Sequence, residues 1–283
     1  MFALYLLADV IYLVLKLVGY RKRVIFQNLR KSFPEKTENE LEVILKGFYW
    51  NFANFIVEML KGLTISKEDI KKRVRFTNLE VLDEFVERQQ SVVFLVAHQF
   101  NWEWALQSGS IQLPMQLDGI YQKLSNPKSD KLIFDSRSRF GATLIEREAS
   151  LKKLISRRKL FRGIAIISDQ VPSRDLKTSV FWTEFLHQET AFNVGPERIA
   201  KMLKPPTLFM NIQSPKRGHY NVEFIKLTEP PYPQSEGDIL KAYIASIERL
   251  IRENPSNWLW SHKRWKHSRK EWEDIIAYKK SSL

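Results

Sequence analysis

The feature that most constrains the fold of this 283-residue chain is a seven-residue run, residues 91–97 (Ser-Val-Val-Phe-Leu-Val-Ala), which is followed directly by His98. A run this short, rich in β-branched and aromatic residues, predicts a buried strand. Residues 163–167 form a second apolar run, and Asp169 and Gln170 follow it closely. Open α/β sheets bind their ligands at the carboxyl ends of strands, so the ends of both runs are candidate sites.

Predicted helices and strands alternate from about residue 63 onward. We expect helices at residues 79–89, 101–114, 126–140, 148–160, 195–203 and 237–252. We expect strands at residues 91–97, 116–122, 142–145, 163–167, 206–212 and 220–227. This alternation predicts an α/β fold with a mixed, mostly parallel sheet flanked by helices. Upstream, residues 38–61 predict a long aromatic helix that begins after Thr37 and ends at Gly62.

Residues 2–20 are almost wholly apolar, and as a helix they would just reach across a hydrocarbon core of about 30 Å. One stripe of that helix carries polar or amphipathic side chains: Tyr5, Asp9, Tyr12 and Lys16. The opposite stripe suits acyl chains: Leu7, Val10, Val14 and Leu17. We expect a retained membrane anchor, spanning or interfacial; the alternative is a core helix of a soluble domain. The predicted organisation is an anchor helix (1–20), a basic and aromatic helical region (21–62) and an α/β domain (63–283).

The chain has a formal net charge of +13, with 45 Lys and Arg against 32 Asp and Glu. Such a surface attracts polyanions: nucleic acid, anionic lipid headgroups or an acidic carrier protein. The basic residues are scattered among apolar helices and form no recognisable nucleic-acid motif, so we expect no nucleic acid among the partners. The absence of cysteine excludes disulfides, thiolate metal sites and cysteine nucleophiles, and is compatible with a cytoplasmic location.

His98 is followed five residues later by a carboxylate, Glu103, at the predicted junction of strand and helix. An imidazole can take a proton from a hydroxyl group, and a carboxylate can fix its tautomer and stabilise the imidazolium. We expect Asn101 to cap the helix that carries Glu103, so that free N–H groups of its first turn could bind an oxyanion. The alternative is a partly buried histidine that a neighbouring group satisfies.

Other charged residues lie near predicted strand ends and would share this cleft. Arg137 and Arg139 are candidates to hold a phosphate or thioester oxygen, although in so basic a chain each can equally be a surface charge. Asp169 can likewise be a structural hydrogen-bond acceptor. The nucleophile elbow, the P-loop, the dinucleotide fingerprint and the paired-histidine zinc motif are all absent from the sequence. We therefore expect direct transfer to a substrate hydroxyl, without a metal or a covalent enzyme intermediate.

These residues follow one another in the order of a known family's motifs. They are the His98 to Glu103 pair in an Asn-Trp-Glu setting, residues 139–141 (Arg-Phe-Gly), residues 169–170 (Asp-Gln) and residues 258–266 (Trp-Leu-Trp-Ser-His-Lys-Arg-Trp-Lys). Three segments upstream match as well: residues 20–23, 28–29 and 33–35. The chain resembles the late, lauroyl/myristoyl acyltransferases of lipid A biosynthesis, within the glycerophosphate and lysophospholipid acyltransferase superfamily.

The resemblance implies O-acyl transfer at the cytoplasmic face of a bacterial inner membrane. The donor would be a thioester of acyl carrier protein or coenzyme A, and no cofactor is expected. His98 would be the general base and Glu103 would orient it. The expected substrate contacts are Asn101, Arg139, Asp169 and Gln170. The expected contacts with membrane or headgroups are Arg21, Lys22, Arg23, Trp258, Trp260, Arg264 and Trp265.

The expected partners are anionic membrane lipids, an acidic acyl carrier protein and a glycolipid or lysolipid acceptor. Two other functions stay open at this point. One is a lysophospholipid or aminolipid acyltransferase that uses the same residues. The other is a basic membrane-bound or nucleic-acid-binding protein without catalytic activity.

Overall fold

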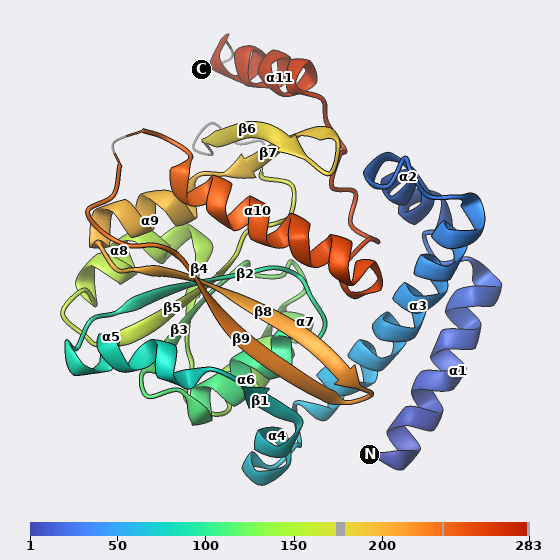
Figure 1. The fold of residues 1–283 in the computed structure, drawn as a ribbon, viewed down its shortest axis with the longest axis horizontal. Helices are drawn as coiled ribbons and strands as arrows, with labels where there is room; N and C mark the ends of the chain where they lie inside the picture. The colour runs from blue at the N-terminus through green and yellow to red at the C-terminus, as the bar shows by residue number, and fades with distance from the viewer. Residues whose placement is uncertain (174–178, 234, 282–283) are drawn as a thin grey trace.

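A seven-stranded sheet lies at the centre of the molecule, whose computed structural model describes residues 1–173, 179–233 and 235–281 (Figure 1). Its strands are β1 (Val74–Phe76), β2 (Val92–Val96), β3 (Gln116–Tyr121), β4 (Thr143–Glu146), β5 (Arg162–Ile167), β8 (Thr207–Lys216) and β9 (His219–Thr228). Their order across the sheet is β1-β9-β8-β2-β5-β3-β4. Every neighbouring pair is parallel except β8 and β9, which are antiparallel. The predicted mixed, mostly parallel sheet is confirmed.

Helices flank this sheet on both faces (Figure 1). They are α1 (Phe2–Val18), α2 (Lys22–Ser32), α3 (Glu38–Lys61), α4 (Lys67–Arg73), α5 (Asp83–Glu87), α6 (Trp102–Gln112), α7 (Pro127–Ser138), α8 (Ser150–Ser156), α9 (Gly195–Leu203), α10 (Asp238–Glu253) and α11 (Arg269–Ser281), with the 3₁₀ helices η1 (Leu79–Leu82), η2 (Arg147–Ala149) and η3 (Pro255–Asn257). The capping sequence before α3 works as predicted. The Thr37 hydroxyl accepts a hydrogen bond from the Glu40 N–H (3.3 Å), and the Glu40 carboxylate accepts one from the Thr37 N–H (2.8 Å).

The side chains of β2 alternate between two hydrophobic cores. Val93 and Leu95 belong to the core that α3, α9 and α10 share with the sheet. Phe94 belongs to the second core, which residues of α4, α5 and α6 complete. All of β2 is buried, which is what a continuous apolar run predicts for a central strand.

A separate two-stranded antiparallel sheet, β6 (Val180–Phe185) with β7 (Gln188–Asn193), has no counterpart in the sequence-based expectations. Its turn is formed by Leu186 and His187, both at positive φ (50° and 62°). Tight hairpin turns are usually recognised by Gly or Asn, and neither residue stands here. The short elements α4 and β1 and the C-terminal α11 likewise lie where no element was predicted.

Helix α1 packs its polar stripe against the protein and leaves an apolar face exposed. The Tyr5 hydroxyl donates to Glu58 of α3 (3.0 Å), and Asp9 pairs with Arg217 (2.7 Å). The exposed face includes Phe2, Leu6, Val10, Leu13, Val14 and Leu17. In the described part of the chain, no single helix has both the length and the apolar composition of a membrane span. Helices α1 and α2 meet both criteria only as a pair, and that pair is bent by 83°.

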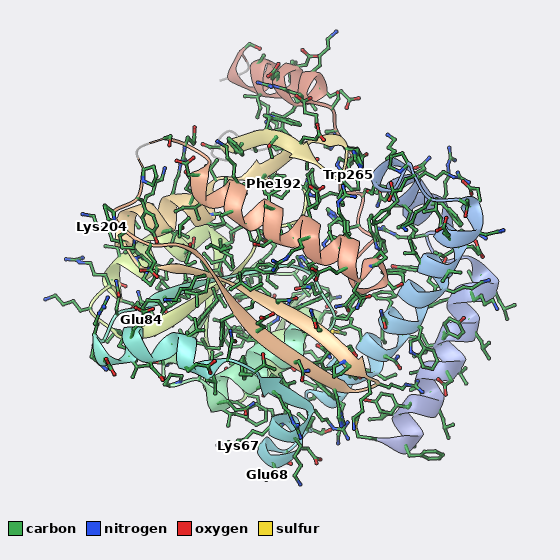
Figure 2. All side chains as sticks on the ribbon, in the orientation of Figure 1. Lys67, Glu68, Glu84, Phe192, Lys204 and Trp265 are labelled. Carbon is green, nitrogen blue, oxygen red and sulfur yellow. The ribbon has the colours of Figure 1, made fainter. Side chains whose placement is uncertain are left out.

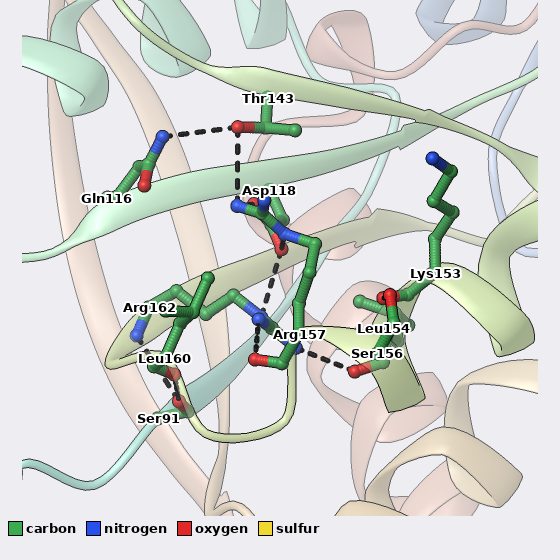
Figure 3. A network of polar contacts seen from close by, with 10 residues as sticks. All are labelled: Ser91, Gln116, Asp118, Thr143, Lys153, Leu154, Ser156, Arg157, Leu160 and Arg162. Atoms are coloured by element: carbon green, nitrogen blue, oxygen red, sulfur yellow. Dashed lines mark hydrogen bonds and ion pairs between the residues drawn. The ribbon is translucent and has the colours of Figure 1, made fainter.

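A buried charge cluster fixes α8 to the sheet on the side away from the strand carboxyl ends (Figure 3). Asp118 of β3 is fully buried and accepts two hydrogen bonds from Arg157 (2.9 and 3.1 Å). Arg162, the first residue of β5, lies 2.9 Å from the same carboxylate. Two cations around one buried carboxylate satisfy it, so this cluster has a structural explanation.

Candidate active site

His98 and Asp169 meet at the carboxyl ends of β2 and β5. These strands are parallel with Val96 opposite Ile167, so the residues two positions beyond each are also neighbours. The His98 Nδ1 atom lies 2.5 Å from Asp169 Oδ1, and the His98 backbone N–H donates to Oδ2 (2.9 Å). A carboxylate at this distance holds the imidazole in one orientation.

Asp169 is fully buried, and it also accepts a hydrogen bond from the indole N–H of Trp258 (2.7 Å). Burial opposes ionisation of this carboxyl, but the facing His98 and the hydrogen bonds from His98 and Trp258 outweigh it and lower the pKa of Asp169. The ionised carboxylate only accepts hydrogen bonds. In the neutral imidazole, Nδ1 therefore carries the proton and Nε2 carries the lone pair.

The Nε2 atom of His98 lies 3.1 Å from the side-chain nitrogen of Gln170. Trp102 stands edge-on to the imidazole, with ring centroids 5.0 Å apart. His98 and Gln170 both line a cavity of about 380 Å³. The expected proximity of His98, Asp169 and Gln170 is confirmed by these contacts, whereas a role in substrate binding stays a prediction.

The cavity is mainly apolar and runs between the sheet and α6. Its apolar wall includes Leu106, Leu117, Ile120, Leu144, Ile167 and Met210. Its polar groups include His98, Glu103, Arg137, Arg147, Gln170 and Asn193. An apolar pocket with a few convergent polar groups is the usual form of a small-molecule site.

Glu103 also lines the cavity, but its contacts differ from the expectation that it orients His98. Its carboxylate accepts two hydrogen bonds from Arg137 (2.6 and 2.8 Å) and one from the Trp102 indole (2.9 Å). Asp169 takes the orienting position instead, because β5 brings it directly beside His98. Burial disfavours the charge of Arg137, but Glu103 more than offsets this and raises its pKa.

Two predicted substrate contacts have structural roles. Asn101 is fully buried and caps α6: its side-chain oxygen accepts from the Trp104 N–H (3.0 Å) and its amide donates to Glu58 (3.0 Å). The helix cap is confirmed, but Asn101 is buried and is not among the cavity-lining residues. Arg139 donates to the backbone carbonyls of Gly62 and Ile65 and is not among the cavity-lining residues.

The predicted headgroup contacts in residues 258–265 are wrong for Trp258, Trp260 and Arg264, since all three are buried. Arg264 donates to the carbonyl of Ala191 and stacks on Phe192, and burial lowers its pKa to about 10. Trp265, labelled in Figure 2, stacks on Phe185 of β6 (ring centroids 6.2 Å apart) and donates to Thr190 of β7 (2.7 Å). Three of the residues expected at a membrane surface thus lie in the interior, and one of them, Trp258, donates a hydrogen bond to Asp169.

The basic residues after α1 stay at the surface. Arg21, Lys22 and Arg23 are exposed, and Arg21 donates to the carbonyl of Ser261 (2.7 Å). Their contact with headgroups stays a prediction. Within residues 1–173, 179–233 and 235–281, no group of three or more His, Cys, Asp or Glu side chains could hold a metal ion.

Sequence reasoning missed two groups at this site. Trp258 supports Asp169 across 89 residues, and Glu58 supports Asn101 across 43 residues. No local pattern signals either contact. The one signal for Glu58 is its position in the aromatic stretch of α3, because an acidic side chain buried among apolar residues needs hydrogen-bond partners.

Comparison with known proteins identifies the family. The profile described as "Bacterial lipid A biosynthesis acyltransferase" matches residues 5–267. Lipid A biosynthesis acyltransferase 2 of Shigella flexneri is 30% identical over 131 residues, which are 45% of this chain and 40% of that protein. A lipid A biosynthesis acyltransferase of Haemophilus influenzae is 24% identical over 243 residues (82% and 72% of the two chains). The lipid A biosynthesis lauroyltransferase of Escherichia coli is 25% identical over 263 residues (90% and 82%).

The matched segment spans less than half of the Shigella protein, whereas it spans most of the Haemophilus and Escherichia proteins. The family profile covers nearly all of this chain, from the first helix to the segment that carries Trp258. The chain therefore belongs to the bacterial lipid A biosynthesis acyltransferase family, a family of acyl-transferring enzymes.

Proposed function

We propose that this protein transfers a fatty acyl chain from a thioester to a hydroxyl group of a lipid A-type glycolipid. The observation that carries the proposal is the His98–Asp169 pair beside an apolar cavity, in a chain of this family. The pair supplies a general base, and the cavity suits an acyl chain. The donor we propose is acyl carrier protein, whose acidic surface would complement a chain of net charge +13.

In the proposed reaction, the acceptor hydroxyl displaces the Gln170 amide from His98 Nε2. Nε2 then takes the hydroxyl proton while the hydroxyl oxygen attacks the thioester carbonyl carbon. Asp169 stabilises the imidazolium that forms. Collapse of the tetrahedral intermediate breaks the carbon–sulfur bond, and the imidazolium returns its proton to the departing thiolate. An ester and a free thiol result, and the enzyme is unchanged.

Arg137 is the residue we propose for stabilising the oxyanion. Its Nε and Nη2 atoms bind Glu103, while within the described residues Nη1 makes no hydrogen bond. Glu103 fixes the guanidinium at the cavity wall, and this preorganisation makes a charged donor effective against a developing negative charge. In this reading, Glu103 positions Arg137 instead of His98.

We propose that the protein works at the cytoplasmic face of the inner membrane. The outward face of α1 is apolar, and Leu17 at its end is 85% exposed. The exposed basic residues Arg21, Lys22 and Arg23 follow immediately, where they can meet anionic headgroups. Because the polar stripe of α1 packs against the protein, we expect α1 to lie in the membrane interface and not to span the membrane.

The proposal is tested with purified full-length protein in detergent micelles, supplied with an acyl carrier thioester and a lipid A precursor that lacks one secondary acyl chain. Mass spectrometry should detect a product heavier by one acyl group. A preparation from cells without the gene controls for contaminating activity. The competing function, acylation of a lysophospholipid, is measured in parallel. Acylation of the lysophospholipid alone would overturn the glycolipid assignment.

A further inference from the structure

Glu58, in the last turn of α3, is a fully buried carboxylate that joins three parts of the molecule. It accepts hydrogen bonds from Tyr5 of α1 (3.0 Å), from Asn101 before α6 (3.0 Å) and from Tyr220 of β9. Burial raises the pKa of Glu58, and its three donors work against that rise. Burying an ionisable carboxyl group costs free energy even when hydrogen bonds compensate part of it. A role for Glu58 in positioning its hydrogen-bond partners would account for this cost.

One branch of this network leads to the first turn of α6, beside His98. Asn101 uses its amide for Glu58 and its oxygen to cap the first turn of α6. Trp104, in that turn, donates its indole N–H to the Glu58 carbonyl (2.8 Å). The turn carries Trp102, which abuts His98, and Glu103, which holds Arg137. Glu58 is therefore bonded to the turn that carries Trp102 and Glu103, and both of these side chains line the cavity.

The other branch leads to α1. Its Tyr5 hydroxyl is one of the three donors to Glu58, and on the same side Asp9 pairs with Arg217. The opposite face of α1 is apolar and exposed. The helix that would meet the membrane thus also contributes a hydrogen bond to the support of Asn101.

We propose that Tyr5 and Glu58 are positioning residues: seating of α1 on Glu58 holds Asn101, and through it the start of α6, in the geometry that the site needs. The inference deepens the proposed function and rests on it only for the activity readout. It makes the first helix a part of the active-site scaffold as well as a membrane contact.

The test compares two variants of the full-length protein on one helix. Tyr5→Phe removes the hydroxyl that reaches Glu58 and keeps the ring. Tyr12→Phe is the matched control, because Tyr12 lies on the same stripe and packs its ring edge-on against Trp50. Hydrogen exchange of peptides covering residues 98–106 is measured first. We expect about tenfold faster exchange in Tyr5→Phe than in Tyr12→Phe.

In the transfer assay, Tyr5→Phe should lower kcat by about 10- to 100-fold, since a displacement of about 1 Å at a catalytic group costs up to about 10² in rate. KM and vesicle binding should match Tyr12→Phe. Glu58→Gln, which keeps the shape of the side chain, should change exchange and kcat in the same direction.

Equal exchange over residues 98–106 in all three variants would overturn the proposal, even with a lower melting temperature. If the wild-type protein transfers no acyl group, the exchange measurement still decides the positioning role. Failure of the proposed function is therefore distinguishable from failure of this inference.

Discussion

The imidazole of His98 and the carboxylate of Asp169 lie 2.5 Å apart although 71 residues separate them in the chain. Parallel pairing of β2 and β5, with Val96 opposite Ile167, places them side by side. Glu103, only five residues from His98, belongs to a different unit with Arg137. The two carboxylates thus have different partners: Asp169 faces His98, and Glu103 binds Arg137.

Arg137 and Arg139 should respond differently to replacement by lysine. Arg137→Lys loses the two-pronged contact with Glu103 and should lower kcat, by roughly 10² if Arg137 contributes one oxyanion donor. Arg139→Lys weakens contacts with two backbone carbonyls and should lower the melting temperature while kcat and KM stay unchanged. Steady-state kinetics and thermal unfolding of both variants provide the check. If only Arg139→Lys lowered kcat, the oxyanion contact would be assigned to Arg139 and not to Arg137.

Gly119 should influence the length of the acyl chain that the cavity accepts. A Cβ atom there would lie 3.3 Å from Leu144 Cδ2 and 3.7 Å from Leu106, inside the apolar wall. Gly119→Leu should therefore shift the preference toward shorter acyl donors and leave the shortest donors well used. Competition between thioesters of different length measures this preference as a ratio, so a general loss of activity does not affect it. An unchanged ratio would place the acyl chain elsewhere.

Stability should fall as the pH drops from about 6.5 to 4, in part because of His262. Burial and the neighbouring Arg264 lower the pKa of His262 to about 4, below the usual value of about 6.5. Between these values the unfolded chain binds the proton and the folded protein does not, so protonation favours unfolding. His262→Gln should make the melting temperature less dependent on pH over this range. An equally steep dependence in the variant would contradict the assignment.

The exposed apolar face of α1 should provide membrane binding that resists salt. Replacement of Leu6, Leu13 and Leu17 by serine removes apolar surface without touching the polar stripe, and should release the protein from vesicles in a high-salt wash. Co-sedimentation with anionic vesicles at low and high salt measures the effect.

A matched control uses the exposed apolar residues of the α8 region, on the opposite side of the molecule from α1 (Figure 1). Serine at Leu151, Ile155 and Leu160 removes a similar set of side chains and should leave binding unchanged. Release by this control and retention by the α1 variant would assign the membrane surface to α8.

The sequence predicts the sheet well because a buried central strand must be apolar on both sides. The runs that become β2 and β5 therefore stand out, and the alternation around them defines the fold class. The pairing of those two strands follows from topology, which no local pattern encodes. The five-residue spacing in the sequence therefore predicts Glu103 as the partner of His98. The register of the two parallel strands instead places Asp169 beside His98.

The misplaced residues share a physical cause. Tryptophan and arginine each combine an apolar part with a polar group, as at Trp258, Trp260 and Arg264. Such side chains occur both at membrane interfaces and in protein interiors where the polar group has a hydrogen-bond partner. Only the path of the chain after α10, which brings Trp258 against Asp169, decides between these environments. The two stripes of α1 are separate in the sequence, and the structure packs the polar stripe against the protein and leaves the apolar stripe exposed, whereas membrane contact of that stripe stays a prediction.

The most direct measurement is the acyl-transfer rate of purified His98→Ala and Asp169→Asn proteins beside the wild type, with folding checked by circular dichroism. Loss of a general base costs about 10²–10⁴ in rate, and an asparagine at position 169 removes the charge that stabilises the imidazolium. We therefore predict that both variants stay folded and lose at least about 10² in kcat. Turnover near the wild-type rate by His98→Ala would contradict the account.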